Sequence, residues 1–139
     1  MRRWLLPLLL SLLALAGQAE ARSKRDKLLD STLAEYAATL RWGNFEGGSA
    51  YIDPAVLEAK PLSSLEIERY RQVRVSYYHA QDPVSVSKTE VRQVVEIGVI
   101  NSHSQSERVV VDRQVWRYDE TAKRWWLMSG LPDITRKEP

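Results

Sequence analysis

The sequence predicts an α+β domain in which three helical segments are followed by a four-stranded antiparallel sheet. Two observations lead to this fold class. Apolar residues recur with the 3.6-residue period of a helix up to residue 40, and after residue 72 they recur with the two-residue period of a strand. Short polar loops separate the strand-like segments, which favours hairpins between neighbours in the chain.

The start of the chain is typical of a secretory signal peptide. Arg2 and Arg3 form a positive n-region, residues 4–16 are an apolar run, and residues 19–21 (Ala-Glu-Ala) form a small-residue cleavage signal. The apolar run has 13 residues, whereas a helix that spans a bilayer needs roughly 20. We therefore expect cleavage after Ala21, a periplasmic or secreted location and no membrane span in the mature chain. An uncleaved anchor is the alternative.

Residues 22–139 are long enough for one domain with a single hydrophobic core. The chain has no cysteine, so neither a disulfide nor a lipid attached at a cysteine is expected. Removing Arg2, Arg3 and Glu20 from 20 basic and 18 acidic residues leaves 18 and 17, a net charge of +1. Without a clustered positive surface, nucleic acid is not an expected partner.

The first expected helix covers residues 26–40, because its apolar side chains fall on one helical face. These side chains are Leu29, Leu33, Tyr36, Ala37 and Leu40.

A short second helix is expected to begin at the N-cap Asn44 and to end before Asp53 and Pro54. The paired Gly47 and Gly48 indicate either that something bulky approaches the backbone there or that this helix is irregular.

The third expected helix runs from Ser63 to about Arg71. Ser63 and Glu66 have the spacing of a capping box.

Four strands are then expected, at residues 73–79, 90–101, 108–118 and 124–129. In the first of these, Val73, Val75 and Tyr77 alternate with polar or outward-facing residues. The segment "QDPVSVSK" is expected to be a turn-rich connection between the first and second strands.

This order of elements resembles the NTF2-like, or SnoaL-like, superfamily. The matching features are a first helix that ends in "LRWGNFEGGSAYIDP" and hairpins that close in "VDRQVWRYDETAKRWWLMSG". The resemblance implies that a long helix and two short ones pack into the concave side of a curved four-stranded sheet, forming a cone with a pocket. It says little about activity, because the superfamily includes isomerases, dehydratases, transport factors and binding modules.

Charge pairing suggests a register for the hairpin between the second and third strands. If the numbers of opposite residues sum to 209, Glu96 faces Arg113; if they sum to 208, it faces Asp112. Opposite charges favour a pair and like charges oppose it, so the odd sum is preferred. Asp112, Gln114, Trp116 and Tyr118 then lie on the side that the helices cover.

The same parity argument, with a five-residue loop at residues 119–123, divides the tryptophans of the last hairpin. It places Trp126 opposite Trp116 on the concave face and Trp125 on the convex face beside Arg117. Stacking of the guanidinium on the Trp125 ring is then expected.

Three functions remain open from the sequence. The favoured one is an exported, non-catalytic module that binds a small apolar or amphipathic ligand in its cone, or an envelope protein partner. The second is an isomerase-like or dehydratase-like enzyme with Asp112 as base and Tyr36, Tyr51 or Tyr77 as hydrogen-bond donor. The third is an envelope assembly protein that forms a homodimer through Val109, Val111, Trp125 and Leu127 of the convex face.

The candidate ligand-binding residues are Trp42, Tyr51, Gln114, Trp116 and Trp126. Each has a purely structural alternative. The tryptophans can pack the core without a ligand, Gln114 can satisfy a buried backbone group, and Asp112, the weak catalytic candidate, can pair with an arginine.

No cofactor or metal site is expected. His79 and His103, the two histidines, are far apart in sequence and lack the carboxylate spacing of a zinc site. "EGGS" lacks the lysine and the spacing of a phosphate-binding loop.

Overall fold

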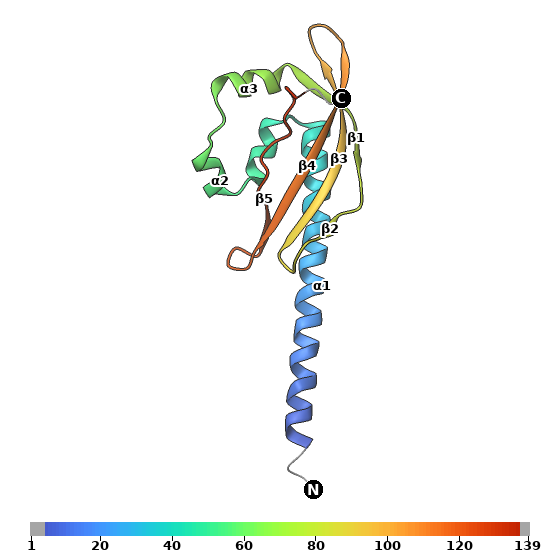
Figure 1. The fold of residues 1–139 in the computed structure, drawn as a ribbon, viewed down its shortest axis with the longest axis vertical. Helices are drawn as coiled ribbons and strands as arrows, with labels where there is room; N and C mark the ends of the chain where they lie inside the picture. The colour runs from blue at the N-terminus through green and yellow to red at the C-terminus, as the bar shows by residue number, and fades with distance from the viewer. Residues whose placement is uncertain (1–4, 137–139) are drawn as a thin grey trace.

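The computed structural model describes the backbone of residues 5–136 and the side chains of residues 14–136. A long helix, α1 (Leu5–Trp42), precedes a 3₁₀ helix, η1 (Glu46–Tyr51), and two short helices, α2 (Pro54–Ala59) and α3 (Ser64–Arg71). The strands are β1 (Val73–Ala80), β2 (Val84–Ser85), β3 (Glu90–Asn101), β4 (Glu107–Asp119) and β5 (Arg124–Leu127). Together they form the expected α+β fold, with the helices packed on a curved antiparallel sheet (Figure 1).

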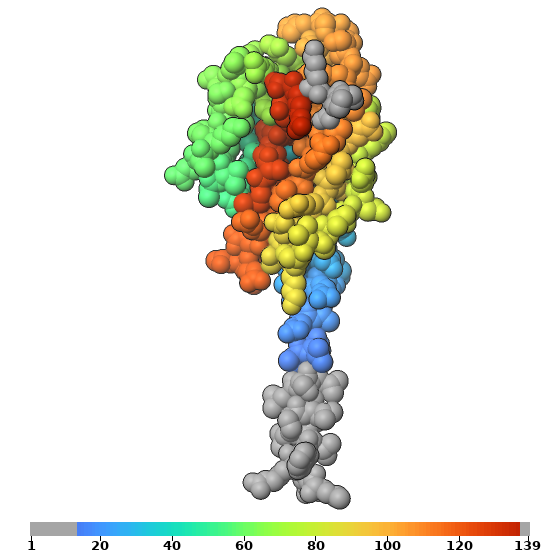
Figure 2. Space-filling view, in the orientation of Figure 1, coloured from blue at the N-terminus to red at the C-terminus, as the bar shows by residue number. Residues whose placement is uncertain are grey.

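Only the C-terminal part of α1 packs on the sheet. Residues 14–24 are all exposed; Arg25 is the first half-buried residue and Leu29 the first buried one. Figure 2 shows the exposed part of α1 projecting from the body of the molecule. From Leu29 onward the predicted apolar face is turned inward, with Tyr36 and Leu40 fully buried. Arg2 and Arg3 of the expected n-region lie outside the described residues.

The segment after α1 contains one more helix than expected. The side chain of Asn44 accepts a hydrogen bond from the backbone N–H of Gly47 at 2.7 Å, but the N-cap of η1 is Phe45, so the predicted cap position was wrong by one residue. The helix η1 ends at Tyr51, before Asp53 and Pro54, as expected. Asp53 then serves as the N-cap of α2, with Pro54 in its first turn, a combination that starts helices.

Both explanations offered for the paired glycines apply. The helix η1 is an irregular 3₁₀ turn, and a β-carbon at Gly48 would lie 2.9 Å from side-chain atoms of Leu40 and Leu131. The capping box of α3 is confirmed, with Ser63 Oγ accepting from the N–H of Glu66 and the Glu66 carboxylate accepting from the N–H of Ser63.

The sheet has the strand order β1-β3-β4-β5, and β2 adds a two-residue pairing with β3 inside the segment expected to be only a connection. The odd register of β3 and β4 is confirmed, but the sum is 207. Glu96 therefore faces Val111, and the predicted pair of Glu96 with Arg113 was wrong. Asp112, Gln114 and Trp116 still lie on the concave face, because the parity of the sum alone fixes the face.

A bulge changes the facing of residues in β1. The register shifts between Val75 and Tyr77, which adds a residue to β1 without a partner on β3. Tyr78 consequently pairs with Ile97 on the concave side, and Tyr77 pairs with Gly98 on the convex side. The expectation that Tyr77 points inward was therefore wrong.

The predicted facing of Trp125 and Trp126 was also wrong. Trp116 pairs with Leu127, so Trp125 lies on the concave side and is 2% exposed, whereas Trp126 lies on the convex side. The loop has four residues, not five, because Asp119 pairs with Arg124. The Asp119 carboxylate accepts hydrogen bonds from the N–H groups of Thr121 and Ala122 and so tightens the turn.

Candidate functional site

A chain of hydrogen-bonded polar side chains crosses the concave face of β4. The amide nitrogen of Gln114 donates to Asp112 Oδ2 and to the hydroxyl of Tyr78, both at 2.9 Å. The indole N–H of Trp116 donates to Gln114 Oε1 at 2.9 Å. Residues two apart on a strand share a face, so the alternation of β4 itself brings these three side chains together.

The chain of polar groups is buried, and burial changes how its members ionise. Burial raises the pKa of Asp112 from 3.8 to about 6, although the hydrogen bond from Gln114 opposes this rise. Burial raises the pKa of Tyr78 to about 12. The pKa of Tyr36, on α1, lies well above its ordinary value, because of burial and the nearby negative charge of Asp112.

The space between α1 and this part of the sheet is filled by aromatic rings. Tyr36 meets Trp116 edge to face with ring centroids 5.3 Å apart, and it meets Tyr51 in the same way at 5.4 Å. Tyr36 and Trp116 are both 0% exposed, and Gln114 is 1% exposed. The Tyr36 hydroxyl is buried and has no hydrogen-bond partner within the described chain. Gln114 and Trp116 therefore occupy packed core and do not line an open cone at this point.

The other predicted site residues are not brought together. Tyr51 packs beside Tyr36 on η1, whereas Trp42 is 77% exposed at the end of α1, next to the guanidinium of Arg41. Trp126 lies on the convex face, where the guanidinium of Arg124 covers its ring at 3.5 Å and its indole N–H donates to Asp119. The expected stacking of Arg117 on Trp125 does not occur, because these two residues lie on opposite faces of the sheet.

A cleft opens elsewhere, between the helices α2 and α3 and the chain that follows β5. It consists of two adjoining cavities of about 300 and 270 Å³. In Figure 2 it lies between the green helices and the red C-terminal segment. The two cavities share five lining residues, which are Lys60, Glu66, Tyr70, Ser129 and Leu131.

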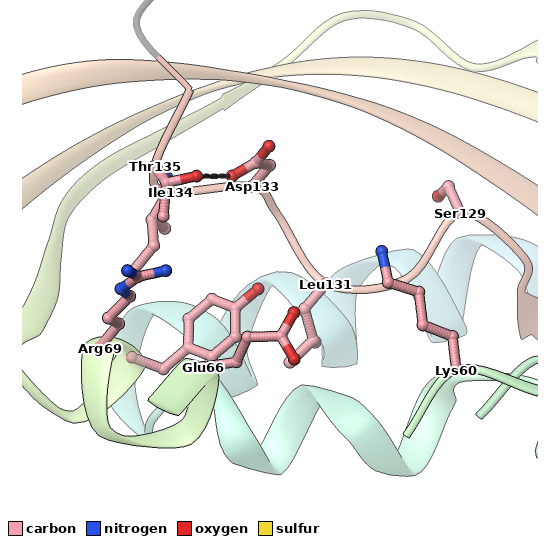
Figure 3. A pocket seen from close by; sticks show the side chains of 9 residues that line it. Lys60, Glu66, Arg69, Ser129, Leu131, Asp133, Ile134 and Thr135 are labelled. Atoms are coloured by element: carbon pink, nitrogen blue, oxygen red, sulfur yellow. Dashed lines mark hydrogen bonds between the residues drawn. The ribbon is translucent and has the colours of Figure 1, made fainter. Parts of the chain in front are cut away.

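The two lobes of the cleft differ in chemistry. We call the smaller cavity the apolar lobe, because its further lining residues are Ile52, Val56, Leu57, Leu62, Met128 and Gly130. We call the larger one the polar lobe, since it adds Arg69, Asp133, Ile134 and Thr135. Figure 3 shows Lys60, Glu66 and Arg69 on the helical side, facing the segment that carries Ser129, Asp133 and Thr135.

The C-terminal wall of the cleft is held to the body of the protein at several points. The hydroxyl of Tyr70 donates to the carbonyl of Pro132 at 2.8 Å, and Ile134 is 4% exposed. Ser129 Oγ accepts a hydrogen bond from the backbone N–H of Val115 on β4. Gly130 adopts a φ of 77°, the left-handed region that glycine tolerates best, where the chain turns away from β5.

Sequence reasoning missed this cleft. Its walls come from residues 52–70 and 128–135, which are far apart in the chain, and no spacing pattern joins them. One signal was available, since Asp53 followed by Pro54 marks the start of the helix α2 that forms one wall.

Within the described residues, no cluster of histidine and carboxylate side chains could hold a metal ion, and no helix is long and apolar enough to cross a membrane. Comparison with protein-family models, with curated proteins and with solved structures finds no match for this chain.

Proposed function

We propose that the protein is an exported, non-catalytic NTF2-like module that binds a small amphipathic ligand in the cleft between α2–α3 and the C-terminal segment. One observation carries this proposal: the cleft has an apolar lobe and an adjoining polar lobe, and Lys60 and Ser129 line both of them. Ligand sites of this kind are concave, mostly apolar and supplied with a few polar groups that orient the ligand.

The site differs from the one expected from the sequence. A ligand under Trp116 would have to displace the ring of Tyr36, which fills that space. A ligand in the apolar lobe would displace only solvent and would contact the side chains of Val56 and Leu57, both half-buried. Covering these side chains would remove apolar surface from water, which favours binding by roughly 25 cal/mol per Å².

Export and cleavage after Ala21 remain part of the proposal. Supporting observations are that residues 14–24 of α1 are exposed and that contact with the domain begins at Arg25, whose carbonyl accepts a hydrogen bond from the indole of Trp125 at 3.0 Å. Cleavage there would leave the core intact. Mass spectrometry of the protein recovered from an exporting cell would test this, with a mature N-terminus at Arg22 as the expected result.

The binding proposal is tested with N-phenyl-1-naphthylamine, a neutral apolar dye whose fluorescence rises when it leaves water. We expect saturable binding to the wild-type protein. The variant Val56→Trp fills the apolar lobe and should weaken binding at least tenfold. Val84→Trp is the matched control, because Val84 is 63% exposed on β2 and lies outside the cleft.

Circular dichroism must show that both variants fold. Absence of saturable dye binding to the wild-type protein, or equal binding by both tryptophan variants, would contradict the proposed site.

An enzyme that uses Asp112 is the second candidate function. The observation in its favour is the buried Asp112 carboxylate, with a pKa of about 6 and hydrogen-bonded to Gln114, because a general base works best with a pKa near the operating pH. Asp112 is 7% exposed and lines neither lobe of the cleft, so a substrate would need α1 to move before it could reach the carboxylate. Screening the wild-type protein and Asp112→Asn for isomerisation of steroid ketones would test it, and equal rates would exclude Asp112 as base.

The third candidate, a homodimer through the convex face, needs a different set of residues. Trp125 and Leu127 are buried on the concave side, which leaves Val109 and Val111 of the expected patch. Val111 pairs with Glu96 on the neighbouring strand β3, and the next valine on this face, Val115, pairs with Arg92 on the same strand. These charges interrupt the apolar surface, which disfavours burial against a second copy.

A further inference from the structure

The two cations of the cleft have no direct partner among the described residues, although the charges of both help to lower the pKa of the Glu66 carboxyl. Neither the ammonium of Lys60 nor the guanidinium of Arg69 forms an ion pair or a side-chain hydrogen bond with any residue in the described part of the chain. Both groups are exposed in the cleft. Together they offer up to eight N–H donors to a ligand.

The acidic groups of the cleft, by contrast, are already engaged. The Glu66 carboxylate accepts from the N–H of Ser63, and Asp133 Oδ1 accepts from both the N–H and the hydroxyl of Thr135. These bonds help to hold the pKa of each carboxyl below its usual value, so both are ionised at neutral pH.

The charged side chains that line the cleft are two cations, Lys60 and Arg69, and two anions, Glu66 and Asp133, so their formal charges balance. Both carboxylates already accept hydrogen bonds, whereas neither cation has a partner at ion-pair distance in the described part of the chain. In the view of Figure 3, Glu66 lies between the two cations, and Lys60 directs its amino group toward the segment that carries Ser129. An anionic group of a ligand would supply the direct partner that the ammonium of Lys60 lacks.

Lys60 and Ser129 lie where the two lobes meet. Both residues line both cavities, whereas Arg69 lines only the polar lobe. The Ser129 oxygen already accepts from Val115, but its O–H donates to no group in the described chain and is free to donate to a ligand. An ammonium and a hydroxyl donor thus stand at the end of an apolar cavity.

We propose that the ligand is an anionic amphiphile, whose carboxylate, sulfate or phosphate group is held by Lys60 and Ser129 while its apolar tail fills the lobe lined by Ile52, Val56, Leu57 and Leu62. This inference rests on the proposed function. Arg69 attracts the head group from the far side of the polar lobe without contacting it.

Three probes with the same tail and different heads test the inference: decanoate, decanol and decyltrimethylammonium, each used to displace the bound dye below its micellar concentration. We expect decanoate to bind at least fivefold more tightly than decanol, and decyltrimethylammonium to bind most weakly. Replacement of the charge by Lys60→Met keeps the apolar stem and should weaken decanoate binding about fivefold, the effect of one partly exposed ion pair.

Binding of decanol should be unchanged in Lys60→Met, and Arg69→Met should have a smaller effect on decanoate. Lys27→Met is the control, because Lys27 is exposed on α1 outside both lobes. If decanol and decanoate bind equally, or if Lys27→Met and Lys60→Met weaken decanoate alike, the anionic head group is refuted while the apolar site stands. If the dye itself does not bind, the proposed function fails and this inference with it.

Discussion

Replacement of Asp112 by asparagine should change how the stability of the protein depends on pH. Burial raises the pKa of Asp112 from 3.8 to about 6, so the folded protein holds this proton more tightly than the unfolded chain does. For a carboxyl with a raised pKa, the stabilisation is present below the unfolded pKa and is lost as the pH rises through the folded one. The loss therefore falls between about pH 4 and pH 6.

The size of the effect follows from the pKa values. At about 1.4 kcal/mol per pKa unit, this group lowers the free energy of unfolding by roughly 3 kcal/mol between pH 4 and pH 7. Asparagine carries no charge and keeps an oxygen that can accept from Gln114. We therefore expect Asp112→Asn to gain stability relative to the wild type as the pH rises, and to be the more stable protein at pH 7.

Urea unfolding followed by tryptophan fluorescence, at several pH values between about 4 and 7, measures this difference. Other carboxyls act in both proteins and cancel when the two are compared. Asp133→Asn is the control, because the hydrogen bonds from Thr135 lower the pKa of Asp133 from 3.8 and its contribution to stability is lost only below that value, so the wild-type minus Asp133→Asn difference should stay nearly constant over this range. A wild-type minus Asp112→Asn difference that stays constant over this range would refute the reasoning.

Three further predictions concern stability. Tyr36→Phe should leave the free energy of unfolding unchanged or raise it by roughly 1 kcal/mol, because the hydroxyl that it removes is buried without a partner; a clear loss in urea unfolding would contradict this. Ser63→Ala should cost about 1 kcal/mol by removing the capping box of α3, whereas Ser63→Thr should retain most of it, as measured by urea unfolding. A chain that begins at Arg22 should melt within about 2 °C of the full-length protein in calorimetry, since residues 14–21 are exposed; a larger fall would mean that the leader packs on the domain.

The order of helices and strands could be predicted, apart from the short α2 and β2, because the longer elements carry their own local signals. The face of α1 was correct because Leu29, Tyr36 and Leu40 recur at helical spacing, and α3 was located by the capping box at Ser63. The concave face of β4 was correct although the charge pair used to choose it, Glu96 with Arg113, does not form, because every odd sum gives the same face. These signals lie within one element or between two adjacent ones, where sequence distance is short.

The sequence does not show on which face of the sheet Trp125 and Trp126 lie. The two residues are adjacent and equally apolar, so the alternation of apolar and polar residues along the strand does not decide which of them points inward. Their facing depended on the length of one loop, and the pair of Asp119 with Arg124 shortened the loop by a residue. A change of one in the register moves every side chain of β5 to the other face. The same holds in β1, where a bulge opposite Gly98 of β3 placed Tyr78 instead of Tyr77 on the concave side.

The cleft was beyond prediction for a different reason. Lys60 and Ser129 are ordinary polar residues in loops, and only the tertiary fold brings them to facing walls of one cleft. The sequence pointed instead to Trp116 and Gln114, whose aromatic and polar character is equally suited to a packed core. The residue type alone does not show whether an aromatic ring packs against a neighbour such as Tyr36 or contacts a ligand.

The hydrogen bond between Trp125 and Arg25 joins residues 100 positions apart, and that between Tyr70 and Pro132 joins residues 62 apart. Closure of the core thus requires contacts between the earliest and the latest parts of the domain. Contacts of such long range make folding slow. During synthesis, α1 has no completed sheet to pack on until β5 has left the ribosome.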